Sequence, residues 1–235
     1  MRSHLPLHTP RGIGLLGAAS LLLLAACGGS DPGGGTKTLY VNAATASDGS
    51  RDGTWIVVEV REGSSDGAIV DDAVVTVTDD EGNARRLNFS GVSIGNFAAG
   101  VYADTDFDFK GGTRLEVERG SDHLFAYLEH PGITTITQPI ANTTFRRTEH
   151  EALRIEWKDA RGRSARFVHI KLDRADYERT LENDPGFHEV EVNRLKPGAN
   201  ETLHVERYNE IQLAGGVTGS RFRATTVHRI DFDVE

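Results

Sequence analysis

The chain has 235 residues, a formal net charge of −9 at pH 7 and a single cysteine, Cys27. The acidic balance argues against nucleic acid as a partner, because binding to phosphates by charge needs an excess of Lys and Arg. One cysteine also excludes an intramolecular disulfide framework and a zinc site built from several thiolates.

The first 26 residues have the layout of a secretory signal peptide. Arg2 and Arg11 give a positive start, an apolar stretch ends at Leu24, and small residues follow. The apolar stretch has about 15 residues, fewer than the ~20 that a membrane-spanning helix needs. We therefore predict that residues 1–26 are a cleaved signal peptide.

The predicted signal peptide ends at the cysteine. Leu24-Ala25-Ala26-Cys27 resembles the lipobox of bacterial lipoproteins, in which the cysteine is lipidated and becomes the first mature residue. The resemblance implies a lipid on Cys27 that anchors the protein to a membrane of the cell envelope. Residue 28 is Gly rather than Asp, and Asp resembles an inner-membrane retention signal in well-studied Gram-negative lipoproteins. This favours the outer membrane, with the periplasmic and surface faces both open.

Residues 27–36 are rich in Gly and contain no large apolar side chain, so we predict that they form a flexible tether. The sequence beyond them is typical of short β-strands separated by turns. Trp55–Val60 and Ala73–Thr78 are rich in β-branched residues, and Asp79–Asn83 has the composition of a turn. Further strands are predicted at 115–118, 124–128, 153–157, 167–172, 190–192, 203–205, 211–213 and 222–234.

Many short strands with Gly/Asp turns predict an all-β fold of antiparallel sandwiches. Pro139 disfavours a central strand near residues 136–144. We therefore predict two tandem β-sandwich domains, at 37–138 and 139–235, each with one buried tryptophan, Trp55 or Trp157. A single continuous sandwich or barrel is the alternative.

Two local features of the second half lead to specific predictions. Asp159–Gly162 has the composition of a hairpin turn between the strands at 153–157 and 167–172. Asp173 is placed to cap a short helix that extends to Leu181, because Asp is a favoured residue at the start of a helix.

Two segments resemble known β-sandwich modules. Residues 73–82, 100–102 and 112–117 resemble the transthyretin-like, carboxypeptidase-regulatory-like module of bacterial envelope proteins, over about residues 54–130. Residues 153–157 resemble the tryptophan strand of fibronectin type III and immunoglobulin-like domains. Both resemblances imply sandwich folds that serve as spacers, scaffolds or binding units, and neither implies a catalytic activity.

The segment that starts at Asp48 is a candidate calcium loop. Asp48, Ser50, Asp52 and Glu59 occupy positions 1, 3, 5 and 12 of an EF-hand-type loop, with Gly53 at position 6. However, residues 54–60 are predicted to form a strand, which turns Glu59 away from the loop. The alternative interpretation is a solvated Asp/Gly turn before that strand.

Other motifs point to chemistry less directly. Asp104, Asp106 and Asp108 form either a second cation site or the solvated face of a strand. Gly91–Gly95 matches the Gly-x-Ser-x-Gly motif of serine hydrolases, but the helix that this motif requires does not follow it. The histidines after the tether lack the spacing of a zinc motif, so we expect surface or hydrogen-bonding roles for them; they are His123, His130, His150, His169, His188, His204 and His228.

These observations predict a non-catalytic, lipid-anchored cell-envelope protein that acts as a scaffold or binding module. Its expected partners are a membrane, through the lipid on Cys27, and an envelope protein or glycan. No cofactor is expected apart from calcium at the Asp48 loop. The alternatives are a calcium-dependent glycan- or protein-binding surface lipoprotein and a metal-dependent envelope enzyme that uses the acidic loops around Asp48 and Asp106.

Overall fold

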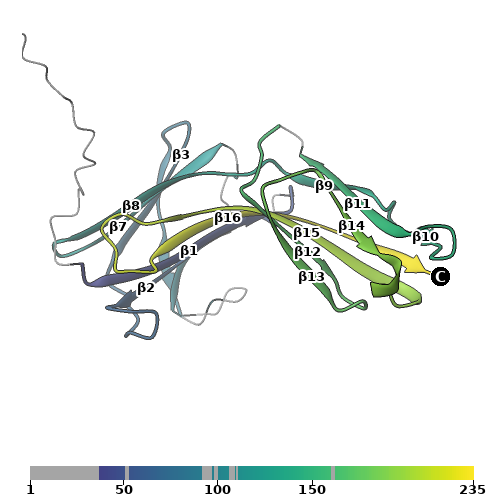
Figure 1. Ribbon diagram of the computed structural model, residues 1–235. Coiled ribbons are helices and arrows are strands. Elements are labelled where there is room, and N and C mark those ends of the chain that lie inside the picture. The colour runs from purple at the N-terminus through teal and green to yellow at the C-terminus, as the bar shows by residue number, and fades with distance from the viewer. Residues whose placement is uncertain are drawn as a thin grey trace, which may run out of the picture. The chain divides into compact units, whose positions relative to one another are not determined.

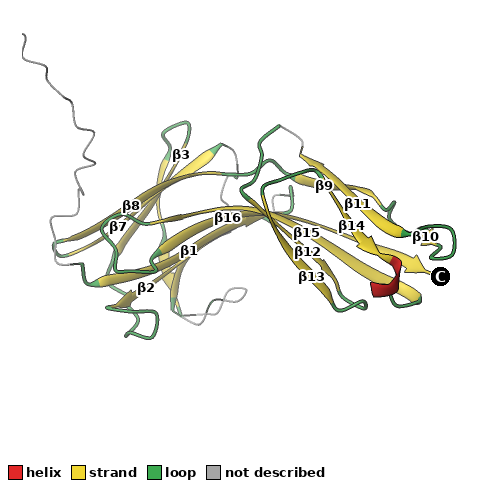
Figure 2. Cartoon of the chain, in the orientation of Figure 1, coloured by secondary structure: helices red, strands yellow, loops and turns green. Residues whose placement is uncertain are grey.

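A computed structural model of the protein describes residues 37–50, 53–91, 97, 100–105, 109, 111–159 and 162–235. These residues form an all-β structure, as predicted (Figure 2). Within them, the helical content is one short 3₁₀ turn, η1 (Val192–Arg194), and no helix is long and apolar enough to cross a membrane.

One large sheet extends through the structure (Figure 1). Its strands, in spatial order, are β13 (Tyr177–Glu182), β12 (Phe167–Leu172), β15 (Gly198–Gln212), β16 (Arg221–Val234), β1 (Leu39–Ser47), β2 (Trp55–Glu62), β6 (Val101–Asp104) and β5 (Asn88–Ser90). The short strand β10 (Thr144–Phe145) pairs with the end of β16. The pairs β1–β16 and β10–β16 are parallel and the other pairs are antiparallel.

Two smaller sheets complete the structure, and both are antiparallel. One consists of β4 (Ala84–Arg86), β3 (Val74–Asp79), β7 (Gly112–Arg119) and β8 (Asp122–Glu129). The other consists of β14 (Phe187–Glu191), β11 (Ala152–Asp159) and β9 (Thr134–Gln138). Each small sheet packs its apolar side chains against a different part of the large sheet.

Two separate hydrophobic cores result. The first core contains Leu39, Val41 and Val58 of the large sheet together with Val75 and Leu115 of the four-stranded sheet. The second core contains Ile170, Leu203 and Phe232 of the large sheet together with Ile155 and Trp157 of the three-stranded sheet. This is face-to-face sheet packing in each core, in which the inner side chains of two sheets interdigitate.

The last strand contributes to both cores. Phe222 and Ala224 of β16 lie in the first core, whereas Ile230, Phe232 and Val234 lie in the second. All are even-numbered, because side chains two residues apart in a strand point to the same face of the sheet. A strand of 14 residues is long enough to reach both cores, since it extends for about 46 Å.

The division into domains at 37–138 and 139–235 stays a prediction, and the cores do not follow it in full. The first core includes Leu213, Phe222 and Ala224, which come from the second predicted range. The reason is the parallel pairing of β16 with β1, which places the end of the chain beside its first strand. The described residues all belong to one compact unit.

Two local predictions are wrong. The turn at 159–162 does not join a hairpin, because β11 pairs with β9 and β14 whereas β12 pairs with β13 and β15. The helix at 173–181 is absent, because Tyr177–Glu182 pairs residue by residue with β12. Asp176 has a positive φ of 54°, which ends any helical path from Asp173. Pairing with an existing strand outweighs a local capping preference.

Other predicted features need smaller changes. The strands predicted at 203–205 and 211–213 belong to one strand, β15, which ends at Gln212, one residue before the end of the second prediction. The first strand, β1, was not among the predicted segments, and its outward side chains include Asn42, Ala44 and Ala46, which carry little β-propensity. Trp157 is buried as predicted, with 5% of its surface exposed, whereas Trp55 is half-buried.

Candidate functional site

A groove with a volume of about 1020 Å³ lies over β1, β2 and β16. The side chains that line it include Arg221, Arg223, Thr225 and Val227, the odd-numbered residues of β16. Because the even-numbered residues of β16 point into the two cores, the groove lies on the opposite, outer face of the large sheet. The volume is at the upper end of the range of small-molecule sites in proteins.

Small side chains on the central strand create the hollow. Ala46 of β1 lies between Thr225 of β16 and Trp55 of β2 in the strand register. Ala44, two residues earlier, pairs with Arg223 on one side. Cross-strand neighbours lie about 5 Å apart, so an alanine between two larger residues leaves a depression. The floor of the groove is therefore Ala44 and Ala46.

The β16 wall of the groove carries two arginines that are held in place. Nε and Nη2 of Arg223 both lie 2.8 Å from Oε2 of Glu210, and the guanidinium lies 4.4 Å from the centre of the Tyr208 ring. Nε of Arg221 donates to Oδ1 of Asn42 at 3.0 Å. Ion pairing and cation–π contact restrict these long side chains, so little conformational entropy remains to be lost on ligand binding.

The β2 wall combines an aromatic ring with a carboxylate. The half-buried Trp55 lines the groove, and so does Glu59. Oε1 of Glu59 accepts hydrogen bonds from Nε and Nη2 of Arg61 at 2.9 and 2.6 Å. Asp48 and Glu206 also belong to the lining. The groove thus offers an apolar ring, hydrogen-bond donors and hydrogen-bond acceptors together.

The predicted calcium loop lies beside this groove. Oδ1 of Asp48 accepts hydrogen bonds from the amide and the hydroxyl of Ser50, at 2.8 and 2.6 Å. These hydrogen bonds lower the pKa of Asp48. Asp52 lies outside the described residues, and Glu59 is paired with Arg61. The calcium site stays a prediction; across the described ranges no three His, Cys, Asp or Glu side chains are grouped as a metal site.

Several other sequence candidates are not described by the structure. Cys27, Asp106 and Asp108 lie outside the described residues, and so does Ser93 of the Gly-x-Ser-x-Gly segment. Asp104 is described; its carboxylate forms an ion pair of 2.6 Å with Arg85. This contact fits a solvated strand face better than a cation site.

The histidines form local polar contacts in separate parts of the structure. Nε2 of His204 lies 2.9 Å from Oδ2 of Asp173, and Nε2 of His188 lies 2.6 Å from the hydroxyl of Tyr177. Nδ1 of His228 accepts the backbone N–H of Ile136 at 3.2 Å. Burial lowers the pKa of His228, so its imidazole is mainly neutral at pH 7.

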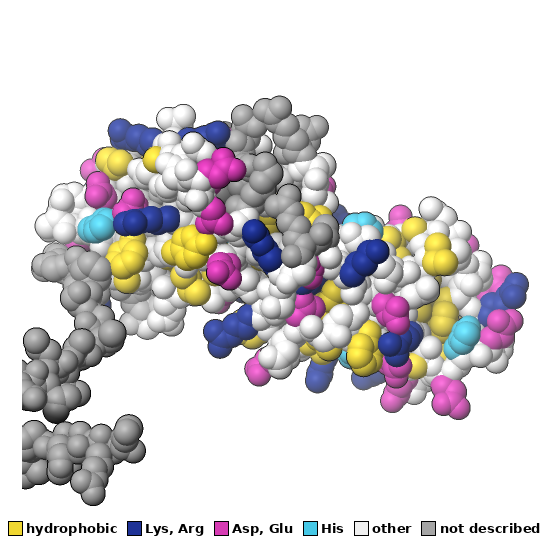
Figure 3. Space-filling model, turned by 90° about the horizontal axis from the view of Figure 1, so that it is seen from above, with side chains coloured by type: hydrophobic (Ala, Val, Ile, Leu, Met, Phe, Trp, Pro, Cys, Tyr) yellow, Lys and Arg dark blue, Asp and Glu magenta, His cyan; other side chains and the backbone are white. Residues whose placement is uncertain are grey.

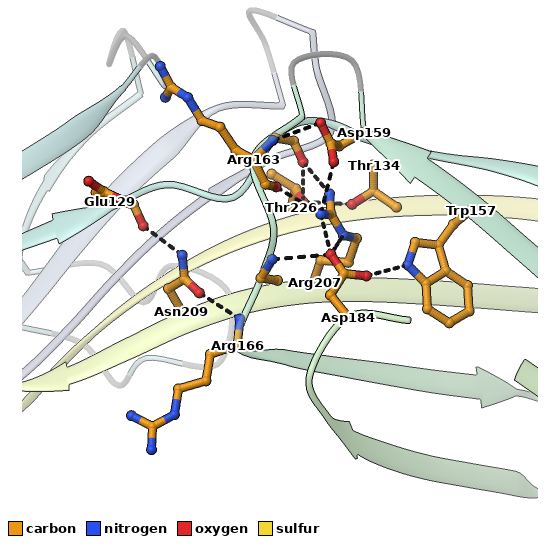
Figure 4. A network of polar contacts seen from close by, with 12 residues as sticks. Glu129, Thr134, Trp157, Asp159, Arg163, Arg166, Asp184, Arg207, Asn209 and Thr226 are labelled. Carbon is orange, nitrogen blue, oxygen red and sulfur yellow. Dashed lines mark hydrogen bonds and ion pairs between the residues drawn. The ribbon is translucent and has the colours of Figure 1, made fainter. Parts of the chain in front are cut away.

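A second polar centre lies on the inner face of the large sheet, between the two cores. Arg207 of β15 is paired with Thr226 of β16, and both are buried. The guanidinium forms ion pairs with Asp159, at 3.3 Å, and with Asp184. It also donates to the backbone carbonyls of Gly132 and Arg163, each at 2.8 Å. Figure 4 shows these groups converging on Arg207.

Asp184 connects this centre to the second core. Its Oδ1 accepts the indole N–H of Trp157 at 2.7 Å, and its Oδ2 accepts the backbone N–H of Ala165 at 3.1 Å. Burial raises the pKa of Asp184, but the hydrogen bonds from Arg207, Trp157 and Ala165 outweigh it and bring the pKa below its usual value. Gly132 has to be glycine here, because a Cβ would lie 2.8 Å from the side chain of Asp159.

The role of Arg207 is structural, because its side chain is 1% exposed and its contacts are all within the protein. Sequence reasoning missed this centre. The sequence did contain a signal for it. Leu203, Val205 and Arg207 are alternate residues of one strand, so Arg207 shares the core-facing side of that strand with two apolar residues. The groove had no comparable signal, because it depends on which strands lie side by side.

Elsewhere on the surface, acidic and basic side chains are interspersed. On the face shown in Figure 3, Lys and Arg side chains lie among Asp and Glu side chains, with hydrophobic side chains between them. A mixed pattern of this kind produces a weak field over that face.

No protein-family model matches the sequence, and the comparison with curated proteins gave no match.

Proposed function

We propose that this chain is a non-catalytic, lipid-anchored protein of the cell envelope that binds a ligand in the groove over β1, β2 and β16. A lipid on Cys27 holds it at the outer membrane, and residues 27–36 act as the tether. Residues 37–138 and 139–235 correspond to two β-sandwich modules of transthyretin-like and immunoglobulin-like type, which share strands of the large sheet. The groove is the observation that carries the binding role.

Three properties of the groove support binding. Its floor is made of alanines on a paired strand, so the hollow exists before a ligand arrives. Arg223 and Arg221 are held by Glu210 and Asn42, which limits the entropy lost on binding. Its lining combines an indole with charged and polar groups, which is the usual composition of a specific site.

A second candidate is binding that depends on calcium. The observation that favours it is that Asp48 and Glu59, two of the predicted ligands, both line this groove. Under this candidate, calcium joins the loop at Asp48 to the ligand. The binding experiment below is therefore repeated with a calcium chelator, and loss of binding on chelation supports the calcium-dependent form.

The test fills the groove. Ala46→Trp places a large side chain on its floor, and Glu178→Trp is the matched control on the exposed edge strand β13 of the same sheet. Each full chain is immobilised and exposed to the components extracted from the envelope of the source cell. We expect the parent and Glu178→Trp proteins to retain a component that Ala46→Trp does not. Identical retention by all three proteins would show that the groove is not the binding site.

A further inference from the structure

The lining of the groove also indicates which class of ligand it fits. We infer that the groove binds a neutral oligosaccharide, an inference that rests on the function proposed above. Three features of the lining support it: the balance of charges, the presence of both hydrogen-bond donors and acceptors, and the indole of Trp55.

The charges in the lining are balanced. Arg221, Arg223 and Arg229 provide positive charge, and Asp48, Glu59 and Glu206 provide negative charge. A site for an anion such as a phosphate or a polyuronate needs an excess of cationic groups, and a site for a cation needs the reverse. This lining has neither excess, so it favours a ligand without net charge.

The hydrogen-bonding groups also match a polyol. The guanidinium groups of Arg221 and Arg223 only donate, whereas the carboxylates of Glu59 and Glu206 only accept. A sugar hydroxyl does both, so a row of hydroxyls can bind to both kinds of group. Backbone amides of a peptide can also do both, but an extended peptide adds to the edge of a sheet. The groove lies in the middle of the large sheet instead, because further strands follow on both sides of β16, β1 and β2.

Aromatic surface completes the site. Trp55 is half-buried and forms part of the β2 wall. The C–H groups on one face of a sugar ring are apolar and slightly positive, so they pack against the negative face of an aromatic ring. On the other side, Arg223 lies over Tyr208, whose ring is stacked on Phe167 with centroids 5.1 Å apart. These two rings lie outside the lining of the groove, and they support the guanidinium of Arg223.

The experiment is a titration of the full chain, in a detergent without a sugar headgroup, with three groups of probes. These are neutral hexose oligosaccharides, oligouronates of the same length, and short uncharged peptides. Binding is followed by calorimetry and by tryptophan fluorescence, because Trp55 and the buried Trp157 are the two tryptophans of the chain.

We expect at least one neutral oligosaccharide to bind and the oligouronates to bind more weakly. Trp55→Ala should reduce the affinity about tenfold or more, because it removes the stacking surface. Tyr127→Ala, at an exposed aromatic residue on β8, is the control and should leave the affinity unchanged. If Trp55→Ala does not fold, judged by its circular dichroism, Ala46→Trp replaces it, with Glu178→Trp as control.

Three results overturn the inference: no binding of neutral oligosaccharides at millimolar concentration, stronger binding of oligouronates, or binding that neither Trp55→Ala nor Ala46→Trp reduces. If a peptide or an oligouronate binds and Ala46→Trp abolishes that binding, the saccharide inference fails but the groove remains the binding site. If no probe binds, the inference fails, and the retention experiment with the envelope extract still decides the proposed function separately.

Discussion

The Arg207 guanidinium and the Asp184 carboxylate form a buried ion pair between the two hydrophobic cores, with side chains 1% and 6% exposed. Neither side chain is open to bulk solvent, so each charge depends on the other and on nearby polar groups of the protein. Arg207 comes from the large sheet, whereas Asp184 lies in the connection between β13 and β14. The pair therefore links the large sheet to the connection that leads into β14, a strand of the three-stranded sheet.

Replacement of Asp184 should cause a large loss of stability. Asp184→Asn keeps the size of the side chain but leaves Arg207 with less compensation for its buried charge. Breaking a buried pair in this way costs about 3 kcal/mol of the free energy of unfolding. Glu189→Gln is the control, because Glu189 pairs with Arg154 on the surface and is 55% exposed, where solvent screens the pair and it contributes little to stability. Urea unfolding of both variants measures the difference, and equal values would show that the buried pair is not important.

The same pair predicts how stability depends on acid. The pKa of Asp184 is lower in the folded protein than in the unfolded chain. Its contribution is therefore complete above the unfolded value of about 3.9 and is lost as the pH falls through the lower folded value. The gap in stability between the parent protein and Asp184→Asn should be constant from pH 7 to about 5 and shrink below about pH 4. A gap that stays constant down to pH 2 would contradict this assignment.

Two buried histidines, His188 and His228, should stay neutral in the folded protein at pH values where histidines of the unfolded chain are protonated. Burial lowers the pKa of His188 and of His228 from the usual 6.5. The unfolded chain therefore binds protons first as the pH falls, so these groups reduce stability below about pH 6.5. Proton NMR titration of the ring signals should give midpoints below 6.5 for both residues in the folded protein and near 6.5 in urea. Midpoints at or above 6.5 in the folded protein would mean that burial does not control them.

The division of the chain into domains can be tested with a fragment. Residues 37–138 alone lack Phe222 and Ala224, and β1 loses its partner β16. Loss of one large core side chain costs about 3–5 kcal/mol, a large part of the stability of a domain. We expect the fragment to show no cooperative unfolding in urea, whereas residues 37–235 unfold cooperatively. A cooperative transition of the fragment would establish 37–138 as an independent domain.

The anchor is tested at Cys27. A radiolabelled or clickable fatty acid should be incorporated into the protein in a bacterial host, and Cys27→Ala should abolish the label and release the protein from membranes. The Ser30→Ala variant, in the tether, should be labelled as the parent is. Label that persists in Cys27→Ala would exclude the lipobox interpretation.

The sequence by itself determined the type of structure. The β-branched runs at 55–60 and 73–78 and the Gly/Asp turns between strands predict an all-β chain, because alternation and turn composition are local properties. Trp157 was correctly predicted to be buried for the same reason, since it alternates with charged neighbours on its strand. Local patterns failed at Asp173, where a favoured helix cap precedes the strand β13 instead of a helix.

Only the tertiary structure decided which strands lie side by side. The pairing of Ala46 with Thr225 joins residues from opposite ends of the chain, and it creates the groove between Trp55 and the arginines of β16. Arg207 likewise meets Asp159 and Asp184 through three separate strands and connections. Such contacts depend on long-range strand order, and each strand has the same alternating pattern whichever neighbour it pairs with. The periodicity of the sequence therefore predicts strands, whereas the sites that they build appear only when the sheet is assembled.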